Sequence, residues 1–233
     1  MMGRVFSIIL LAVVAGCTVS VIPGDGGPST PATTSVRVAH AAADELAFDV
    51  CASGEVILEN ARYGRVTDYA TARAGAVTFR VIDAGGSCND VIQSITFDLT
   101  ANRAYTVLVL DDVEPLPLLD DTSPVSFGRA RIRVINASRN SLAIDVYEQG
   151  GLRFFDDIRY NEPGDYAYIT VPAGTYELTI EPLGGSKTPI TLEPTLLARG
   201  RVYTLLVFGR VDAADDANPF SALLQDDGYA GEL

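Results

Sequence analysis

The sequence predicts an all-β protein with two tandem antiparallel β-sandwich domains, placed after an export signal and a flexible tether. Three observations lead to this prediction. Apolar and polar residues alternate with a period of two, turn residues recur at short intervals, and the second half of the chain repeats the first. Beyond the first residues, no stretch keeps helical spacing over three turns.

The N-terminus has the order of a bacterial export signal. One basic residue, Arg4, precedes an apolar run from Val5 to Ala15. This run is too short to cross a bilayer, which takes a helix of about 20 residues, but it is typical of a signal peptide. Val14-Ala15-Gly16-Cys17 also resembles the lipobox, so we expect residues 1–16 to be removed and Cys17 to be acylated. The alternative is an ordinary secreted protein in which Cys17 is incidental.

Residues 17–34 predict a flexible tether, because they are rich in Pro, Gly, Ser and Thr and lack apolar periodicity. No later segment of the sequence is apolar for long enough to span a membrane as a helix. We therefore expect a cell-envelope protein that is held at the membrane by its lipid. In a Gram-negative cell this would be the outer membrane or the cell surface.

The two halves align with a period of about 100 residues, which indicates tandem domains rather than a short-period solenoid. Val36-Arg37-Val38 aligns with Ile132-Arg133-Val134, and Leu46–Val50 aligns with Leu142–Val146. Further matches are Asp68-Tyr69 with Asp165-Tyr166, Tyr105-Thr106 with Tyr203-Thr204, and Leu118–Asp121 with Leu223–Asp227. We expect domains at 35–121 and 129–228 that fold separately and are joined by the Pro124-containing segment between them.

Within each repeat the pattern is that of strands. Val77, Phe79 and Val81 alternate with polar residues, as an amphipathic strand requires. The runs AYTVLVL (104–110) and VYTLLVF (202–208) are almost continuously apolar, which predicts central strands buried on both faces. About seven short strands in about 100 residues is typical of an immunoglobulin-like sandwich.

Asp49 and Asp145 occupy the middle of the predicted strands LAFDV and LAIDV, although aspartate is a poor strand former. Arg37 and Arg133 lie between inward-facing apolar residues of the preceding strand. We therefore expect structural cross-strand pairs of Arg37 with Asp49 and of Arg133 with Asp145. A ligand-binding role for these pairs is the alternative.

These repeated residues resemble the bacterial domain-of-unknown-function family 4397. The resemblance covers residues 35–228 and rests on the following segments: Arg37–Val50 with His40 and Ala41, Arg133–Val146, Pro172–Tyr176, Tyr105-Thr106 and Tyr203-Thr204. Asn136 replaces the histidine in the second copy. The resemblance implies a β-rich, secreted or surface-attached module, and it supplies no catalytic residues.

Charge excludes one class of partner. The chain has a formal net charge of −13, with 17 Lys and Arg against 30 Asp and Glu. Because nucleic-acid binding needs clustered cations, we expect no nucleic-acid partner. The expected partners are the membrane, through the lipid, and an extracellular or periplasmic protein or glycan.

An enzyme is the alternative to a binding or structural surface module. Any Ser–His–Asp or Cys–His mechanism would need His40, the single histidine, and its counterpart is Asn136. We therefore expect a structural histidine at a strand end and no catalytic residues. The acidic pairs leave open a carboxylate-dependent glycoside hydrolase acting on cell-wall or other polysaccharide.

No cofactor is expected, and calcium is the metal that the acidic loops would suit best. Asp111, Asp112 and Glu114 form the densest group, followed by Asp212, Asp215 and Asp216. Neither group has the spacing of an EF-hand loop.

Cys51 and Cys88 predict a disulfide within the first repeat. If Cys17 carries lipid, the exported chain keeps an even pair of cysteines in a compartment that permits oxidation. The aligned positions of the second copy are Tyr147 and Lys187, so both cysteines are absent together. Two free thiols, one of them packed in the core, are the alternative.

Overall fold

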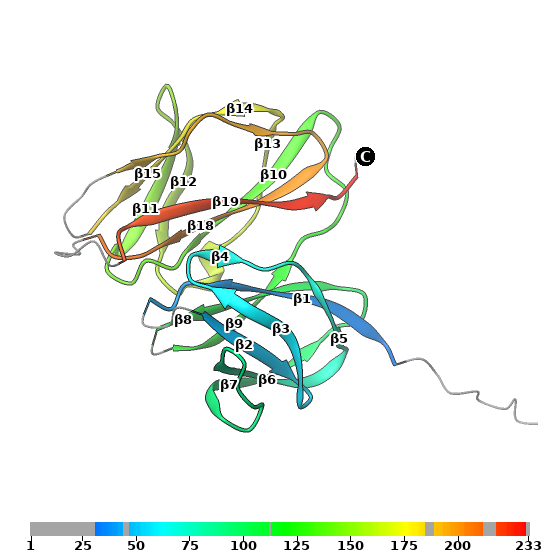
Figure 1. Cartoon of the computed structure of the whole chain (residues 1–233). Coiled ribbons are helices and arrows are strands. Elements are labelled where there is room, and N and C mark those ends of the chain that lie inside the picture. The colour runs from blue at the N-terminus through cyan, green and yellow to red at the C-terminus, as the bar shows by residue number, and fades with distance from the viewer. Residues whose placement is uncertain (1–30, 44–46, 112, 185–188, 212–217, 232–233) are drawn as a thin grey trace, which may run out of the picture. The chain divides into compact units, whose positions relative to one another are not determined.

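The computed structural model describes residues 31–43, 47–111, 113–184, 189–211 and 218–231. Its regular structure consists of strands and one short 3₁₀ turn, η1 (Pro163–Asp165), which confirms the all-β prediction (Figure 1). One compact unit, Pro31–Leu233, contains both repeats. In the part of the chain described here, no helix is long and apolar enough to cross a membrane. The export signal, Cys17 and most of the predicted tether lie outside the described residues.

The first repeat forms two sheets. One has the order β4-β1-β8-β9, and β5 also pairs with β1. Its strands are β1 (Thr33–His40), β4 (Arg65–Val66), β5 (Ala70–Arg73), β8 (Ala104–Leu110) and β9 (Val113–Asp120). The other has the order β3-β2-β6-β7. Its strands are β2 (Ala47–Ala52), β3 (Glu55–Arg62), β6 (Gly75–Asp83) and β7 (Val91–Leu99).

The second repeat builds the same two sheets again, with the orders β13-β10-β18-β19 and β12-β11-β15-β16. The first contains β10 (Arg129–Asn136), β13 (Ile169–Pro172), β18 (Arg201–Phe208) and β19 (Ser221–Tyr229). The second contains β11 (Ala143–Glu148), β12 (Leu152–Arg159), β15 (Leu178–Pro182) and β16 (Ile190–Thr191). A further two-stranded sheet joins β14 (Gly174–Tyr176) to β17 (Thr195–Leu197).

Among the described strands, each repeat has one parallel pair. β1 runs parallel to β8, and β10 runs parallel to β18, whereas the other strand pairs of these sheets are antiparallel. The parallel register places Arg37 beside Thr106 and Arg133 beside Thr204. The immunoglobulin-like strand order stays a prediction.

Alternate residues of β1 and β8 face different clusters. Val36, Val38, Val107 and Val109 pack with residues of β2 and β6 in a core of the first repeat. Ala39, Leu108 and Leu110 instead join a second cluster, which is formed mainly by the second repeat.

In β10 and β18, neighbouring residues on opposite faces, Val134 and Ile135 and likewise Leu205 and Leu206, all belong to this second cluster and are fully buried. The cluster therefore contains residues of both repeats. This shared burial explains why the runs 104–110 and 202–208 are almost continuously apolar, and it confirms that they are buried on both faces.

A disulfide joins Cys51, in β2, to Cys88, in the turn after β6, with 5.9 Å between their Cα atoms. The predicted bond is thus confirmed. Cys51 is fully buried, and Arg80 Nη1 donates a hydrogen bond of 2.9 Å to the carbonyl oxygen of Cys88. The bond ties a strand of the first repeat to the loop between β6 and β7.

Candidate functional site

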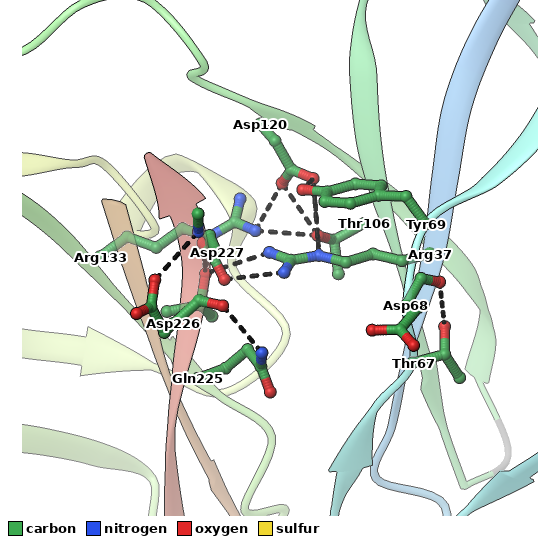
Figure 2. Close-up of polar contacts among 12 residues, drawn as sticks. Arg37, Thr67, Asp68, Tyr69, Thr106, Asp120, Arg133, Gln225, Asp226 and Asp227 are labelled. Atoms are coloured by element: carbon green, nitrogen blue, oxygen red, sulfur yellow. Dashed lines mark hydrogen bonds and ion pairs between the residues drawn. The ribbon is translucent and has the colours of Figure 1, made fainter. Parts of the chain in front are cut away.

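Arg37 and Arg133 lie at equivalent positions of β1 and β10, and both side chains are almost completely buried, at 2% and 1% exposure. Each guanidinium pairs with a carboxylate of the other repeat. Arg37 Nη1 lies 2.7 Å from Asp227 Oδ1, and Arg133 Nη2 lies 2.5 Å from Asp120 Oδ1. Figure 2 shows the two arginine side chains extending toward each other from opposite sides, with Asp120 above their guanidinium groups.

Two threonines complete this buried group. Arg37 Nε donates to Thr106 Oγ1 at 2.9 Å, and Arg133 Nε donates to Thr204 Oγ1 at 3.0 Å. Each threonine hydroxyl in turn donates to the acid of its own repeat: Thr106 to Asp120 at 2.9 Å, and Thr204 to Asp227 at 2.6 Å.

We call these six residues the junction network: Arg37, Thr106, Asp120, Arg133, Thr204 and Asp227. Its two guanidinium and two carboxylate groups balance in formal charge. Buried charges are tolerated only when they are paired and hydrogen-bonded, and each member meets this condition.

Asp227 reaches the network through a β-bulge. In the pairing of β18 with β19, Tyr203 faces Asp226 while Val202 faces Gly228, so Asp227 is the extra residue. An extra residue bends the strand and redirects side chains. Gly228 takes a φ of +119°, a conformation that other residues rarely adopt. As a result Asp226 is exposed and pairs with Arg201, whereas the side chain of Asp227 is only 5% exposed.

A tyrosine ring lies against each arginine. The Arg37 guanidinium carbon is 4.7 Å from the centre of the Tyr69 ring, and that of Arg133 is 4.9 Å from the centre of the Tyr168 ring. Tyr69 and Tyr168 are therefore structural counterparts. Tyr69 directly precedes β5 and Tyr168 directly precedes β13, and each of these strands pairs with the strand that carries the arginine. The sequence alignment of Tyr69 with Tyr166 is therefore wrong by two residues.

The buried surroundings change the ionisation of these side chains. Burial alone would lower the pKa of Arg37, but its hydrogen bond with Asp227 and the charges of Asp227 and Asp120 raise the pKa above the ordinary value. Burial first, and then the charge of Asp120, raise the pKa of Tyr69; burial likewise raises the pKa of Tyr168. Both tyrosine hydroxyls therefore keep their protons at neutral pH.

The predicted pairs of Arg37 with Asp49 and Arg133 with Asp145 are wrong. β1 and β2 belong to different sheets, as do β10 and β11, so these residues are not cross-strand neighbours. Asp49 instead accepts hydrogen bonds from the backbone N–H groups of Asn60 and Gly85, both at 2.7 Å.

Asp145 has a comparable role in the second repeat. It accepts from the backbone N–H of Asp157 at 2.9 Å, and from the Tyr147 hydroxyl at 3.0 Å. Asn60 and Asp157 both have a φ of +53°, and both lie on strands whose pairing shifts register near the aspartate. Each mid-strand aspartate thus holds an irregular neighbouring strand.

His40 ends β1, as predicted, and is fully buried. Its Nδ1 accepts from the backbone N–H of Ala42 at 3.2 Å, and its ring centroid lies 4.2 Å from that of Phe48. Asn136 makes the equivalent bond, because its Oδ1 accepts from the N–H of Ser138 at 3.0 Å. His40 and Asn136 therefore accept equivalent backbone hydrogen bonds, which fix the chain just beyond the ends of β1 and β10.

The calcium candidates fall largely outside the described structure. Asp112 and residues 212–217 are not described, and neither is the side chain of Glu114. Asp111 lies at the turn after β8. Within the residues that the structure describes, no group of three or more His, Cys, Asp or Glu side chains could hold a metal ion.

A pocket of about 140 Å³ adjoins the junction network. Its lining includes Tyr69, Asp120, Tyr168 and Asp227, together with Asp121 at the end of the first repeat. Sequence reasoning did not identify this site. The signal was present, since both repeats contain a Tyr-Thr pair and a Leu-Leu pair that is followed by two acids, but only the packing of the repeats shows that these segments meet.

Comparison with known families gives one match. Residues 34–147 match the family model of DUF4397, a domain of unknown function. The match begins within β1 and ends within β11, so it covers the first repeat and the first two strands of the second. No curated protein sequence matches the chain.

Among solved structures, the chain is similar to the Bacillus anthracis TIE protein, at 9% identity and a TM-score of 0.25. The aligned region covers 84% of this chain and 44% of the TIE protein chain. It is also similar to a "putative cell adhesion protein" from Bacteroides eggerthii, at 12% identity and a TM-score of 0.23, covering 88% and 98% of the two chains. A third, described in the same words, comes from Parabacteroides distasonis, at 9% identity and a TM-score of 0.25, covering 84% and 97%. TM-scores this low establish no shared function.

Proposed function

We propose that the chain is a lipid-anchored protein of the bacterial cell envelope that acts as a non-catalytic binding module, with its two β-repeats held together as one body. The anchor rests on the lipobox at Cys17, and the single body rests on the exchange of partners in the junction network. Arg37 of the first repeat pairs with Asp227 of the second, and Arg133 of the second pairs with Asp120 of the first. Such an exchange fixes the orientation of one repeat against the other.

Further contacts between the repeats support a single body. The rings of Tyr63 and Phe208 meet edge to face, with 5.4 Å between their centroids. A Cβ at Gly64 would lie 2.6 Å from the Phe208 ring, so this glycine permits the close approach. These contacts add apolar burial to the buried ion pairs.

The chemistry of the network favours a structural role over catalysis. A glycoside hydrolase needs one carboxylic acid that donates a proton and one carboxylate that attacks or activates water. Asp120 and Asp227 are each engaged by a guanidinium and a threonine hydroxyl. Carboxylates engaged in this way suit a structural role.

The first experiment tests the single body. Unfolding of the exported full chain, followed by calorimetry and by near-ultraviolet circular dichroism, should give one coincident transition. Residues 35–121 and 129–233, expressed apart, are predicted from the sequence to fold separately. We also expect each half to be much less stable than the full chain, because separation removes the two ion pairs between the repeats, Arg37 with Asp227 and Arg133 with Asp120. Two independent transitions in the full chain would contradict the single body.

The second experiment tests the anchor. The wild-type chain, expressed in a bacterial host that acylates lipoproteins, should partition into detergent and carry the mass of a lipid on Cys17. A Cys17→Ala variant should lose both properties. A Cys17→Ala chain that still partitions wholly with membranes would contradict the anchor.

A further inference from the structure

β7 forms one edge of the sheet β3-β2-β6-β7 in the first repeat (Figure 1), and β6 is its neighbour among the described strands of that sheet. After a register shift at the start of β7, its pairing with β6 is regular from Gln93 to Leu99. The outer backbone N–H and C=O groups of an edge strand can pair with another strand. Natural sheets block such pairing with prolines, bulges and charged side chains.

The other long edge strands of the first repeat carry these devices. β9 contains Pro115 and Pro117, and β3 shifts register twice against β2 and carries Glu55 and Glu59. β7 contains no proline and a single charged residue, Asp98. Its regular part is therefore open to a further strand.

The second repeat blocks the equivalent edge. Gly75 and Gly174 are equivalent in the repeat alignment, and they pair with Leu99 of β7 and with Leu197 of β17. In the second repeat this edge is divided between β16 and β17, and Glu193-Pro194 lies in the interruption. A proline has no N–H to donate to a neighbouring strand. Of two copies of one fold, one interrupts this edge and the other keeps it continuous.

The side chains of β7 also suit strand addition. Ile95 and Phe97 pack against the core of the first repeat but are only partly buried, and Phe97 stacks on Phe79 with 4.9 Å between the ring centroids. A further strand would cover the rest of this apolar row. The opposite row, Ser94, Thr96 and Asp98, is exposed.

A second copy of β7 matches this edge when the two strands run antiparallel about Thr96. In this register Thr96 faces Thr96 of the second copy, Ile95 faces Phe97, and Ser94 faces Asp98. A pair of an aromatic and a β-branched side chain stabilises neighbouring strands, and so does a pair of threonines. The contact is isologous, because each copy contributes the same residues.

The charges are complementary in the same register. Arg80 of β6 pairs with Ser94, so it shares the face of Ser94, Thr96 and Asp98. Asp98 of the second copy would lie on the far side of Ser94, about 10 Å from Arg80 as two strand spacings. The small Ser94 side chain leaves room for the long arginine side chain to extend toward that carboxylate. No like charges face each other, although the chain as a whole has a net charge of −13.

We propose that two copies of the chain pair through β7, antiparallel and centred on Thr96, so that the β3-β2-β6-β7 sheet continues from one chain into the other. This pairing goes beyond the proposed function, because it requires neither the lipid nor a ligand. It assigns β7 as an interaction surface and a second copy of the chain as its partner.

The experiment is sedimentation velocity of the exported full chain in detergent, from nanomolar to high micromolar concentration. The wild type should form a dimer that dissociates on dilution. Thr96→Lys and Thr96→Glu each place like charges opposite each other at the centre of the strand pair, so each variant alone should dimerise about tenfold more weakly. An equimolar mixture of the two variants should recover the dimer, because the lysine of one chain then faces the glutamate of the other.

The matched control lies on the edge of the second repeat. The Thr191 hydroxyl bonds to that of Thr179 at 3.0 Å, as the Thr96 hydroxyl bonds to that of Thr78 at 2.6 Å, and both pairs are exposed. Thr191→Lys should therefore dimerise like the wild type. At concentrations at which all the proteins are monomers, the variants should unfold at the wild-type temperature, because the replaced side chains are exposed.

Four results would each overturn the inference: a wild type that stays monomeric at every concentration, equal dimerisation by the wild type and the Thr96 variants, equal weakening by Thr191→Lys, and no recovery in the mixture. A chain that is anchored through Cys17 and unfolds as one body but stays monomeric would leave the proposed function standing and reject the β7 pairing alone.

Discussion

Arg37 and Asp227 are 190 residues apart in the sequence, yet their side chains form a buried ion pair of 2.7 Å. Arg37 lies in β1, near the start of the described chain, and Asp227 lies in β19, near its end. The pair therefore closes the folded region end to end, and it does so between the two repeats. Its energetics can be tested directly.

Breaking this pair from either side should be costly. Arg37→Met or Asp227→Leu alone removes the close ion pair and leaves the buried network with an unbalanced charge, so each should lower the free energy of unfolding by about 3 to 5 kcal/mol. The double variant should lose much less than the sum, because it removes both charges. Denaturant unfolding of the four proteins measures this coupling.

The exposed pair of Arg201 and Asp226 is the matched control, since both residues lie on the same strand pair, β18 and β19, and are 37% and 42% exposed. The same substitutions there should cost less than about 1 kcal/mol. Additive losses at Arg37 and Asp227 would contradict the coupling.

Removing the Asp49 carboxylate should destabilise the first repeat. In Asp49→Ala, the backbone N–H groups of Asn60 and Gly85 both lose the carboxylate that accepts their part-buried hydrogen bonds, at a cost of about 0.5 to 1.5 kcal/mol for each bond. Thermal unfolding measures the effect. Asp98→Ala, on the exposed face of β7, should change stability by less than about 0.5 kcal/mol. Equal changes in thermal stability in the two variants would contradict a stabilising role for the Asp49 carboxylate.

Replacing both bonded cysteines by serine should destabilise the protein by about 3 to 4 kcal/mol, because the bond closes a loop with a sequence separation of 37. Unfolding with and without reductant measures this difference. Non-reducing peptide mapping of the exported chain should recover the Cys51–Cys88 peptide. Two alkylatable thiols in folded, non-reduced protein would contradict it.

Stability should fall at alkaline pH. Burial, followed by the charge of Asp111, raises the pKa of Tyr63 from 10.0 to about 12, and burial also raises the pKa of Tyr69, Tyr166 and Tyr168. Above pH 10 the unfolded chain loses these tyrosine protons while the folded chain keeps them. The free energy of unfolding is thus highest below pH 10 and decreases as the pH rises toward 12.

Denaturant unfolding from pH 8 to 12, with tyrosinate absorbance recorded in parallel, checks this dependence. Tyr63→Phe should lose less stability over the same range, because it carries one fewer tyrosine that titrates differently in the two states. A free energy of unfolding that stays constant or rises above pH 10 would refute it.

The sequence by itself determined the class of fold and the local chemistry. Period-two alternation follows from strand geometry, so the strands at 77–81, 104–110 and 202–208 could be recognised residue by residue. The paired presence of Cys51 and Cys88 indicated their bond, because a disulfide needs both partners. The similarity of the halves indicated which strands would be equivalent.

The partners of the charged residues depended on tertiary structure. Arg37 and Asp49 are close in sequence, and a local pair was the natural expectation, but β1 and β2 enter different sheets. The inward orientation of the Asp227 side chain depends on a one-residue bulge in β19, which changes which side chains of this strand point inward. Strand periodicity reports only which residues share a face, whereas the packing of one repeat against the other decides which buried charges meet.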